Sequence, residues 1–443
     1  MASYDQMELQ DIFDEINGHI HSPVPGFFAK YFTERTMAPS WSILKHNPRL
    51  QKFLYSKVKC QWAFELFLNI FQEDRVFRCY RDYACEQSMA RYRVVSRDVL
   101  RQREFYKWED VKLVGLFQKT QTAYGQGILQ LCIDASEVFL SQPTRLFLHG
   151  FHVFGSQTQL WVFDRSGLYG SETFEMHEEP ERLITIFDNY SKMSDTELGV
   201  NPLVHTDDTG NYITCQLGND KESKGKAIRL YLEEEPIADP FQMVSQGPIC
   251  FPARCPGSQE SEFVVKFSWR SSNRRRPENI MLQRAKDRNV TGVVQLVSHC
   301  HVATISDLHQ GLEVGPSKSF ATLSDLDLGE SSGSGFSFPE DLALSCLVIS
   351  PLGYRLDEFQ SIPEFLEACC GAIQGHRSLY LDGNILHQDI SPGNIIILEK
   401  GKPEQPRGML IDLDLAIDLA VGPSRPGERV GTMPFMAIGV LQG

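Results

Sequence analysis

The chain has 443 residues, of which 42% are hydrophobic and 11% aromatic, an ordinary composition for a globular protein. This length exceeds what one hydrophobic core normally organises, so we expect two or three domains. Acidic residues outnumber basic ones by 57 to 43, and the net charge of −14 argues against a protein that mainly coats nucleic acid or anionic membrane.

The first hundred residues have the pattern of amphipathic helices. Apolar residues recur every three or four positions in Glu8–Ile16 and again in Trp62–Phe71, which predicts one buried face for each helix. The prolines and the glycine of His21–Gly26 predict a connecting turn. We therefore predict a helical N-terminal region over residues 1–105.

A basic stretch with interleaved tyrosines extends over Arg75–Lys112. Because charge runs usually mark solvent-exposed faces, we interpret it as an exposed helix face. A nucleic-acid or phosphate-binding surface is the alternative that this composition leaves open. The stretch includes Tyr80, Tyr83, Arg91, Tyr92, Arg93, Arg97, Arg101, Arg103 and Tyr106.

The middle third of the chain changes its hydrophobic period and alternates between strands and helices. We predict an α/β domain over residues 106–238. Its acidic and aromatic residues form no acid/base or metal constellation, so we assign it no chemistry. The predicted strands are Val111–Phe117, Arg145–Phe154, Gln159–Phe163, Tyr212–Leu217 and Ala227–Leu232, the helices are Ile128–Leu140 and Glu181–Tyr190, and Asp164–Gly167 is a turn.

A third domain is predicted over residues 239–443, interrupted by an insertion at about 311–339. The insertion contains Gly329–Gly335, a run of glycine, serine and glutamate that is low in complexity. Such segments cannot bury a core, so we expect a flexible loop whose serines are candidate modification sites.

Two segments near the C-terminus combine residues that phosphoryl transfer requires. In the first, His387 precedes Asp389 by two positions, and Asn394 follows five positions later. In the second, the apolar run Met409–Ile411 ends in Asp412. One carboxylate can orient or deprotonate an attacking hydroxyl group, while an amide and a second carboxylate can hold Mg²⁺ on the phosphates. Taken singly, each of these residues has an ordinary structural explanation in a turn or a core.

Upstream segments supply the other parts of such a site. Lys266 lies on the apolar strand Glu262–Phe267, the context of a lysine that contacts phosphates. Glu278 begins a helical pattern 12 residues later and could pair with Lys266, although an acidic residue also suits the start of any helix. We further predict a buried strand at Leu342–Ser350, a turn at Pro351–Gly353 and a long helix at Ile362–Tyr380.

Several of these segments resemble the fungal-type protein kinase family, protein-kinase-like proteins abundant in mushroom-forming fungi. The resemblance covers about residues 106–443. It implies an α+β fold, in which a bilobal protein-kinase-like domain follows the α/β domain and the helical N-terminal region. The segments that carry it are Val264–Trp269, His387–Ser391, Ile411–Ala416 and Gly431–Ile438, and Trp161–Gly167 resembles the region that precedes the kinase domain.

The resemblance also implies roles for individual residues. ATP and Mg²⁺ are the expected cofactors, and a Ser/Thr side chain of a protein is the expected acceptor of the γ-phosphate. By this resemblance, Lys266, Glu278 and Gly247 bind ATP, Asp389 is the catalytic base, and Asn394 and Asp412 are the metal ligands.

The phosphate-binding loop departs from the pattern of protein kinases. Where kinases carry G-x-G-x-x-G, the segment Val244–Cys250 contains only Gly247. Pro248, which follows it, has no N–H group to offer to a phosphate.

Three substitutions also change the charges around the catalytic residues. Gln388 replaces the arginine that usually pairs with the phosphate group of a phosphorylated activation loop. Ser391 replaces a lysine, which removes one positive charge near the transferring phosphoryl group. Asp414 replaces the glycine of D-F-G and adds a carboxylate beside the metal site, a feature shared with the fungal-type pattern.

The end of the sequence departs from the pattern as well. Ala437–Gly439 stands where Ala-Pro-Glu closes the activation segment, and the sequence ends at Gly443. We therefore expect a kinase domain truncated after this segment, with an apolar face of its smaller C-lobe exposed. A catalytically impaired pseudokinase or nucleotide-binding interaction module is the alternative, and a small-molecule phosphotransferase, which shares the Asp…Asn…Asp scheme, is a third.

Location and partners follow from what the sequence lacks. No signal peptide is visible, and no apolar run reaches the length of a membrane span. The 11 cysteines include no C-x-x-C pair and no cluster with zinc spacing. We therefore expect reduced thiols in the cytosol or nucleus and no bound membrane. The acidic excess argues against nucleic acid as a partner, and a protein substrate is what the family resemblance implies.

Overall fold

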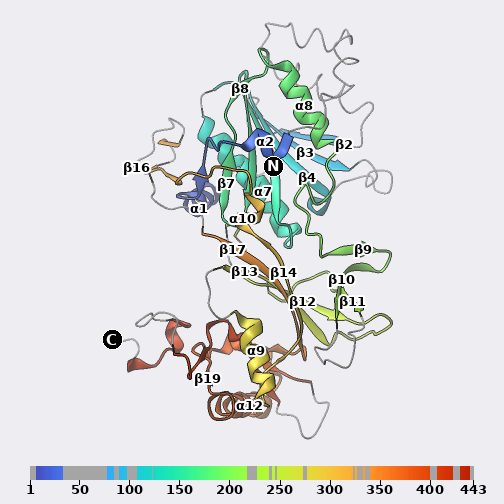
Figure 1. Ribbon diagram of the computed structural model, residues 1–443, viewed down its shortest axis with the longest axis vertical. Helices are drawn as coiled ribbons and strands as arrows, with labels where there is room; N and C mark the ends of the chain where they lie inside the picture. The colour runs from blue at the N-terminus through green and yellow to red at the C-terminus, as the bar shows by residue number, and fades with distance from the viewer. Residues whose placement is uncertain are drawn as a thin grey trace. The chain divides into compact units, whose positions relative to one another are not determined.

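The described part of the chain forms two compact units, each built from three separate segments. The chain therefore passes from one unit to the other five times. Unit 1 comprises Met1–Pro202, Pro240–Gly247 and Thr304–Leu342, and unit 2 comprises Leu203–Asp239, Pro248–Ala303 and Ala343–Gly443. The computed structural model describes residues 6–32, 77–83, 89–96, 107–121, 123–216, 227–238, 242–244, 247–272, 277–322, 325–326, 333–334, 340–399, 407–422 and 430–439 (Figure 1).

The core of unit 1 is a mixed ten-stranded sheet. Its strand order is β16-β15-β1-β7-β6-β5-β4-β3-β2, and β8 pairs with β6. The strands are β1 (Ile20–His21), β2 (Phe77–Tyr83), β3 (Met89–Ser96), β4 (Val111–Gln118), β5 (Phe147–Phe154), β6 (Gln157–Asp164), β7 (Gly167–Gly170), β8 (Phe174–Glu175), β15 (Lys318–Ser319) and β16 (Gly333–Ser334).

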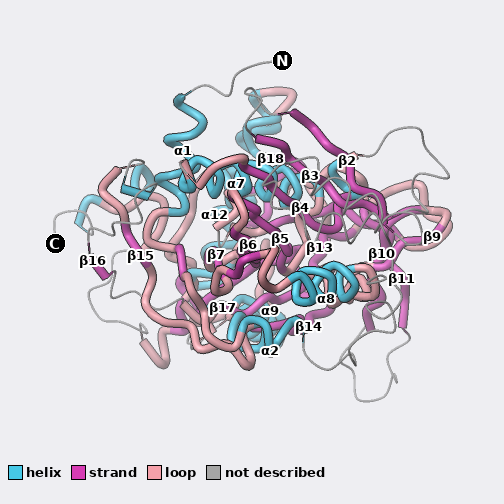
Figure 2. Tube along the Cα trace, turned by 90° about the horizontal axis from the view of Figure 1, so that it is seen from above, coloured by secondary structure: helices cyan, strands magenta, loops and turns pink. Residues whose placement is uncertain are grey.

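Helices cover both faces of this sheet because its central strands are apolar on both sides. In β6, Leu160 and Val162 pack under α2 and α8, whereas Trp161 and Phe163 pack under α1 and α7. The strand period of two residues produces this division, and Figure 2 shows α7 and α8 on opposite sides of these strands. The helices are α1 (Gln6–Ile16), α2 (Phe27–Phe32), α7 (Tyr124–Ser141), α8 (Pro180–Tyr190) and the single turn α10 (Ile305–Leu308).

A β-α-β unit lies at the centre of unit 1. β4 and β5 are parallel neighbours, and α7 is the crossover that a parallel pair requires. Gly115 in β4 lets the ring of Phe151 pack onto the backbone, because a Cβ atom at this position would lie 2.0 Å from the Phe151 ring. The strands and helices predicted between residues 111 and 190 are confirmed, with boundaries shifted by a few residues.

The interpretation of the basic stretch as an exposed helix face is wrong for its described part, which forms β2, β3 and β4. Arg91 and Arg93 point into unit 1 and are 8% and 7% exposed. Their guanidinium groups lie 3.1 Å and 3.5 Å from one carboxylate oxygen of Asp134 in α7. This acidic partner makes the burial of two positive charges tolerable. Arg97, Arg101, Arg103 and the predicted helix Trp62–Phe71 lie outside the described residues.

Removal of the Asp134 carboxylate should strongly destabilise unit 1. In Asp134→Ala, two buried guanidinium groups lose the carboxylate that they share, which should cost about 3 kcal/mol of unfolding free energy. Urea unfolding of the full chain, followed by tryptophan fluorescence, measures this loss. Glu109→Ala, which removes an exposed carboxylate beside exposed Lys107, is the matched control and should change stability by less than about 0.5 kcal/mol. Equal stability of Asp134→Ala and Glu109→Ala would contradict a stabilising role for the buried pair.

The insertion between β14 and β17 is part of unit 1 instead of an entirely loose loop. His309 Nε2 lies 2.7 Å from Asp164 Oδ2, and both side chains are buried. Lys318 pairs with Ile20 of β1, and Phe320 joins the core between α1 and α7. The buried Phe320 side chain and the buried His309–Asp164 pair thus hold this segment on unit 1, although the neighbouring sequence is low in complexity. Within Gly329–Gly335, only residues 333–334 are described, as β16.

A second short excursion holds residues 242–244 in unit 1. Met243 is 1% exposed, and the Val244 N–H donates to Glu15 Oε1 over 2.8 Å. Arg165, from the predicted turn after β6, donates to the carbonyl oxygens of Gln242 and Met243. The segment predicted as the phosphate-binding loop, residues 244–250, therefore begins in unit 1 and continues into the first residues of β12.

Unit 2 contains a seven-stranded sheet of order β14-β17-β13-β12-β11-β10-β9. The predicted domain boundary at residue 238 differs from this arrangement, because β11 pairs antiparallel with β12 and so brings β10 and β11 into unit 2. The predicted strand Leu342–Ser350 is confirmed as β17. The strands are β9 (His205–Asp207), β10 (Gly210–Gln216), β11 (Ala227–Leu232), β12 (Ile249–Arg254), β13 (Phe263–Ser271), β14 (Gln295–Thr304) and β17 (Leu342–Ser350).

The rest of unit 2, where it is described, contains two α-helices, two small sheets and several single 3-10 turns. A three-stranded sheet has the order β18-β20-β21, and β19 pairs with β22. The predicted helix at Ile362–Tyr380 is confirmed as α12. These elements are α9 (Glu278–Asp287), α12 (Ile362–Leu381), β18 (Tyr354–Arg355), β19 (Ile385–Leu386), β20 (Ile395–Ile397), β21 (Gly408–Leu410) and β22 (Ile417–Asp418).

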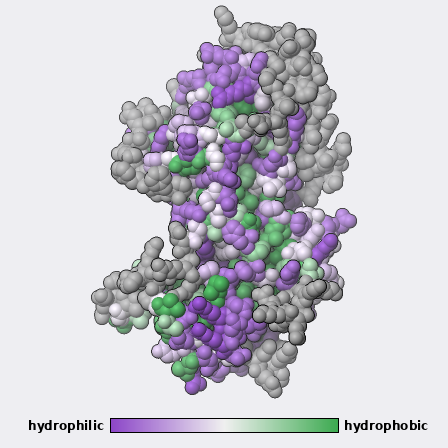
Figure 3. All heavy atoms as spheres, viewed as in Figure 1, coloured by the Kyte–Doolittle hydropathy of each residue, from purple (hydrophilic) through white to green (hydrophobic). Residues whose placement is uncertain are grey.

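One side of α12 is apolar and exposed. Ile362, Leu366, Ile373 and Tyr380 are between 50% and 70% exposed, and their spacing places them along one stripe of the helix. Apolar residues interrupt the hydrophilic surface in the region of α9 and α12 on the face shown in Figure 3. Among the described helices, none is long and apolar enough to cross a membrane.

Candidate functional site

Lys266 is a buried cation at the centre of unit 2. It lies in β13, which pairs with β12 so that Lys266 is opposite Cys250. Only 4% of Lys266 is exposed, and its Nζ atom lies 2.7 Å from Glu278 Oε2 and 2.9 Å from Asp412 Oδ1. Two carboxylates from different segments therefore converge on one ammonium group. A buried lysine needs such compensation to remain charged.

Glu278 reaches Lys266 from the first turn of α9. Pro277 precedes the helix in an extended conformation, and Glu278 is its first residue. The predicted Lys266–Glu278 pair is therefore present. Glu278 also lies at the N-terminus of α9, where the helix dipole favours a carboxylate. The pairing with Lys266 and this helix-end effect therefore both apply to Glu278.

The electrostatics of this triad favour the charged forms of Lys266 and Asp412. Burial acts to lower the pKa of Lys266, but Glu278 and Asp412 outweigh it and raise that pKa above its ordinary value. Burial acts to raise the pKa of Asp412, but the charge and hydrogen bond of Lys266 bring it below its ordinary value. Burial raises the pKa of Glu278 against the opposing effect of Lys266. Asp412 is therefore ionised near neutral pH and available to a cation.

His387 fixes the geometry of the segment that carries Asp389. The His387 ring is fully buried, its Nε2 lies 3.0 Å from the Ile411 carbonyl oxygen, and the Asp389 N–H donates to its Nδ1 over 3.3 Å. Burial lowers the pKa of His387, so the ring is neutral near pH 7. A neutral ring can donate to Ile411 through Nε2 and accept from Asp389 through Nδ1. The histidine thus ties the Asp389 segment to the segment that leads into Asp412.

Asn394 connects the same two segments. Its Nδ2 atom donates to the Asp389 carbonyl oxygen over 2.8 Å and to Asp389 Oδ2 over 3.0 Å. Its own carbonyl oxygen accepts from the Ile411 N–H over 3.1 Å, directly before Asp412. Gln388 and Asp412 have φ angles of 68° and 62°, unusual for residues other than glycine. Such backbone conformations cluster at functional sites.

Thr432 is a contact of Asp389 that sequence reasoning did not identify. Its N–H and its hydroxyl group both donate to Asp389 Oδ1 over 2.7 Å. Gly431 permits this approach with a φ of 112°, because a Cβ atom there would lie 2.6 Å from the Gln388 carbonyl oxygen. The Gly-Thr dipeptide was the only available signal, and it indicates a contact only once the chain is known to return to Asp389.

Arg270 is a second residue that sequence reasoning missed. Its Nε atom lies 3.0 Å from Asp414 Oδ2, and Asp414 is 8% exposed. The carboxylate that was predicted to add negative charge beside the metal site is thus paired with a cation. Arg270 follows Lys266 by four positions in β13, which places both side chains on the same face of the strand.

The oxygen donors of this site fit a hard divalent cation. Asp412 offers an ionised carboxylate, and Asn394 offers its Oδ1 oxygen, since Nδ2 is used on Asp389. Mg²⁺ prefers oxygen ligands and commonly binds through one or two protein groups together with substrate phosphates. These two residues could therefore hold Mg²⁺ on a nucleotide.

Five of the six predicted site residues lie in unit 2 and are connected through the contacts described above. They are Lys266, Glu278, Asp389, Asn394 and Asp412. The sixth residue, Gly247, belongs to the short segment of unit 1 that directly precedes Pro248 and β12. It is half-buried. Its predicted contact with ATP stays a prediction.

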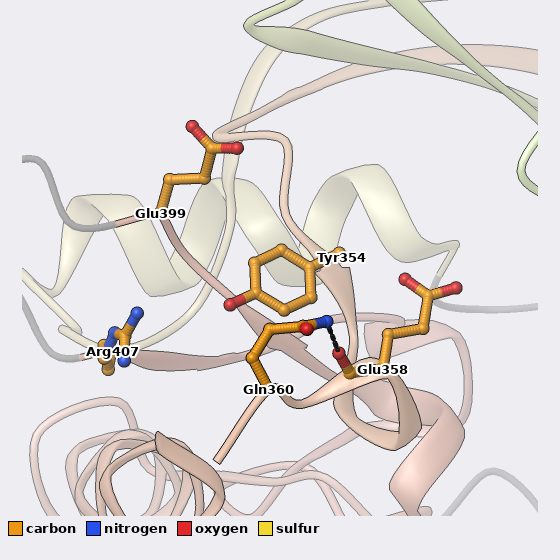
Figure 4. A pocket seen from close by; sticks show the side chains of 5 residues that line it. All are labelled: Tyr354, Glu358, Gln360, Glu399 and Arg407. Carbon is orange, nitrogen blue, oxygen red and sulfur yellow. Dashed lines mark hydrogen bonds between the residues drawn. The ribbon is translucent and has the colours of Figure 1, made fainter. Parts of the chain in front are cut away.

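A separate pocket of about 520 Å³ lies in unit 2 between β18 and the hairpin of β20 and β21. Figure 4 shows the Tyr354 ring between the side chains of Glu399, Glu358, Gln360 and Arg407. The guanidinium group of Arg407 is already bound, 2.7 Å from Glu364. The hydroxyl group of Tyr354 donates to the same carboxylate over 2.6 Å. We assign this pocket no role in the site around Asp389.

Comparison with known proteins extends the likeness over most of the chain. A family model described as fungal protein kinase matches residues 92–443. The match begins within β3 and includes all six predicted site residues. A search of curated proteins finds no match.

Proposed function

The chain belongs to the fungal protein kinase family, and from this premise we propose that unit 2 transfers the γ-phosphate of ATP to a Ser or Thr hydroxyl group of a protein, with Mg²⁺ as the cofactor. In this proposal the seven-stranded sheet with α9 corresponds to one lobe of a protein-kinase-like domain. The elements from β18 onward correspond to the second lobe. The proposed partner is a protein substrate.

The single observation that carries the proposal is the pairing of Lys266 with both Glu278 and Asp412. Three segments that are far apart in the sequence meet at one buried ammonium group. Phosphoryl transfer is catalysed mainly by positioning and charge stabilisation, and a lysine oriented by a glutamate is a recurrent part of such sites.

The remaining residues divide the chemistry among themselves. Asp389 accepts or orients the proton of the attacking hydroxyl group, and Asn394 holds the Asp389 carboxylate in place through Nδ2. Lys266 places positive charge beside the phosphates, since its pKa is raised and its ammonium group is oriented by Glu278. Asp412 and Asn394 Oδ1 hold Mg²⁺, which supplies charge neutralisation on the phosphate oxygens.

Nucleotide binding with and without Mg²⁺ tests this proposal. We expect ATP with Mg²⁺ to raise the melting temperature of the full chain and ATP with EDTA to raise it much less, because Asp412 needs a cation between itself and the phosphates. In Asp412→Asn, the part of the shift that depends on Mg²⁺ should disappear. Asp357→Asn, which changes an exposed carboxylate beside Arg355, is the control and should behave as the wild type. A shift that is the same with and without Mg²⁺ would contradict the metal assignment.

A nucleotide-binding module without turnover is the second candidate. It is favoured by Val244, the first residue of the predicted phosphate-binding loop, because its N–H donates to Glu15 in unit 1, whereas the glycine-rich loop of an active kinase is mobile. Thr432, which occupies Asp389 Oδ1 with two hydrogen bonds, also favours it. This candidate predicts the same Mg²⁺-dependent shift with no phosphate transfer, so turnover decides between the two.

A further inference from the structure

A second ion pair lies beside the triad of Lys266 in unit 2. The Nε atom of Arg270 is 3.0 Å from Asp414 Oδ2, and the two side chains are 21% and 9% exposed. Lys266, on the same face of β13, has its Nζ atom 2.9 Å from Asp412 Oδ1. One strand therefore offers two cations to two carboxylates that lie two positions apart in the chain.

The segment that carries these carboxylates has an unusual backbone. Asp412 has a φ of 62° and a ψ of 71°, left-handed values that residues other than glycine rarely adopt. A single 3-10 turn, Leu413–Leu415, follows directly. Such a conformation persists only where the surrounding contacts hold it. The Leu413 side chain, fully buried in the core of unit 2, holds the turn through apolar contacts, and the two ion pairs hold it through polar ones.

The two ion pairs differ in what else their members have to bind. In the proposed site, Lys266 serves the phosphates as well as Asp412, and Asp412 serves Mg²⁺ as well as Lys266. Their mutual contact therefore competes with both ligands and cannot by itself keep Asp412 in place. Arg270 and Asp414 have no assigned ligand. Their contact can hold the turn whether or not a nucleotide is bound.

We propose that Arg270 is a positioning residue for the metal ligand Asp412 and that it acts through Asp414. This inference rests on the proposed function, because it requires that Asp412 holds Mg²⁺. Residues that orient a metal ligand without touching the metal typically contribute about 10–100-fold to metal affinity. Loss of the Arg270–Asp414 pair should therefore weaken the Mg²⁺-dependent part of ATP binding by about that factor.

A purely structural role for Arg270 leads to a different expectation. Asp414 is 8% exposed, and a buried carboxylate needs a cationic partner for stability whatever its neighbours do. If Arg270 only neutralises Asp414, its removal lowers the melting temperature but leaves the effect of Mg²⁺ on ATP binding unchanged. The effect of Mg²⁺ is therefore the quantity that separates positioning from stabilisation.

Calorimetric titration of the full chain with ATP measures this effect. The dissociation constant of ATP is determined in EDTA and in saturating Mg²⁺, below the melting temperature of each variant, and the first constant is divided by the second. We expect Arg270→Gln and Asp414→Asn each to lower this ratio by about tenfold and to leave the constant in EDTA unchanged. The double variant should lose no more than either single variant, because both substitutions remove one pair.

Matched substitutions control for the loss of an arginine from the sheet. Arg254→Gln removes a half-buried arginine from the neighbouring strand β12, where its Nε atom lies 3.4 Å from Glu233 Oε1, and should keep the wild-type ratio. Arg270→Lys retains the positive charge and should keep most of the ratio. Asp414→Asn, which exchanges one oxygen atom for an amide group, decides the question if Arg270→Gln fails to fold.

The possible outcomes separate this inference from the proposed function. A wild-type ratio in Asp414→Asn and Arg270→Gln, or an equal loss in Arg254→Gln, would overturn the positioning role and leave the proposed function intact. If Mg²⁺ does not strengthen ATP binding by the wild type at all, the proposed metal site is itself contradicted, and the inference fails with it.

Discussion

Asp389→Asn is expected to lower phosphate transfer by about 10³-fold and to leave Mg²⁺-ATP binding unchanged. The substitution removes the carboxylate that accepts or orients the hydroxyl proton, and general-base catalysis is worth about 10²–10⁴-fold. An asparagine Oδ1 can still accept the hydrogen bonds from Thr432, so the local fold should persist. Release of ADP measures turnover, and the thermal shift with Mg²⁺-ATP measures binding.

A matched variant controls for the loss of a carboxylate near the site. Asp357→Asn also exchanges one oxygen for an amide group, but on an exposed residue paired with Arg355. Its turnover should equal that of the wild type. Equal turnover by Asp389→Asn and the wild type would refute the role of Asp389. A joint loss of turnover and ATP binding in Asp389→Asn would instead indicate a structural role.

Lys266→Met is expected to abolish the Mg²⁺-ATP shift and to reduce the free energy of unfolding by about 3–5 kcal/mol. Removal of one partner from a buried ion pair leaves the other charge uncompensated, and Glu278 is 5% exposed. Lys286→Met, at an exposed position of α9, is the matched control and should be nearly neutral. Urea unfolding of both variants measures the difference.

The stability deficit of Lys266→Met should depend on pH. Without the ammonium group, burial raises the pKa of Glu278 further, so the folded variant favours the protonated carboxyl group. A group whose folded pKa is raised in this way binds a proton more strongly in the folded state, and the deficit should shrink as the pH falls from 7 toward 5. Lys266→Met/Glu278→Leu should recover stability at pH 7 without recovering ATP binding. A deficit that is independent of pH, or absent, would contradict the buried pair.

Local patterns in the sequence were enough to predict the elements that carry the site. The helical period of residues 362–380 predicted α12, and the apolar strand around Lys266 predicted β13. The pair of Lys266 and Glu278 was one of two interpretations of Glu278 that the sequence left open, and the family resemblance implied it. In these cases the decisive interactions lie within a dozen residues of one another.

Contacts between distant segments could not be predicted in the same way. Arg91 and Arg93 are buried because Asp134, about 40 residues later, compensates their charge, and a charge run alone cannot reveal such a partner. The assignment of residues 304–342 to unit 1 depends on His309 meeting Asp164. Nothing in either segment by itself indicates that contact. The placement of residues 242–244 in unit 1 could not be predicted either, because it depends on contacts with the distant residues Glu15 and Arg165.

The most direct measurement is the transfer of radiolabelled γ-phosphate from ATP to a library of peptides containing Ser or Thr, with and without Mg²⁺, by the wild type and by Asp389→Asn. If Lys266, Glu278, Asp389, Asn394 and Asp412 form a phosphoryl-transfer site, the wild type labels peptides only with Mg²⁺, and the variant labels them about 10³-fold more slowly. Binding of Mg²⁺-ATP by the wild type with no more labelling than by Asp389→Asn would contradict a catalytic site and leave a nucleotide-binding module.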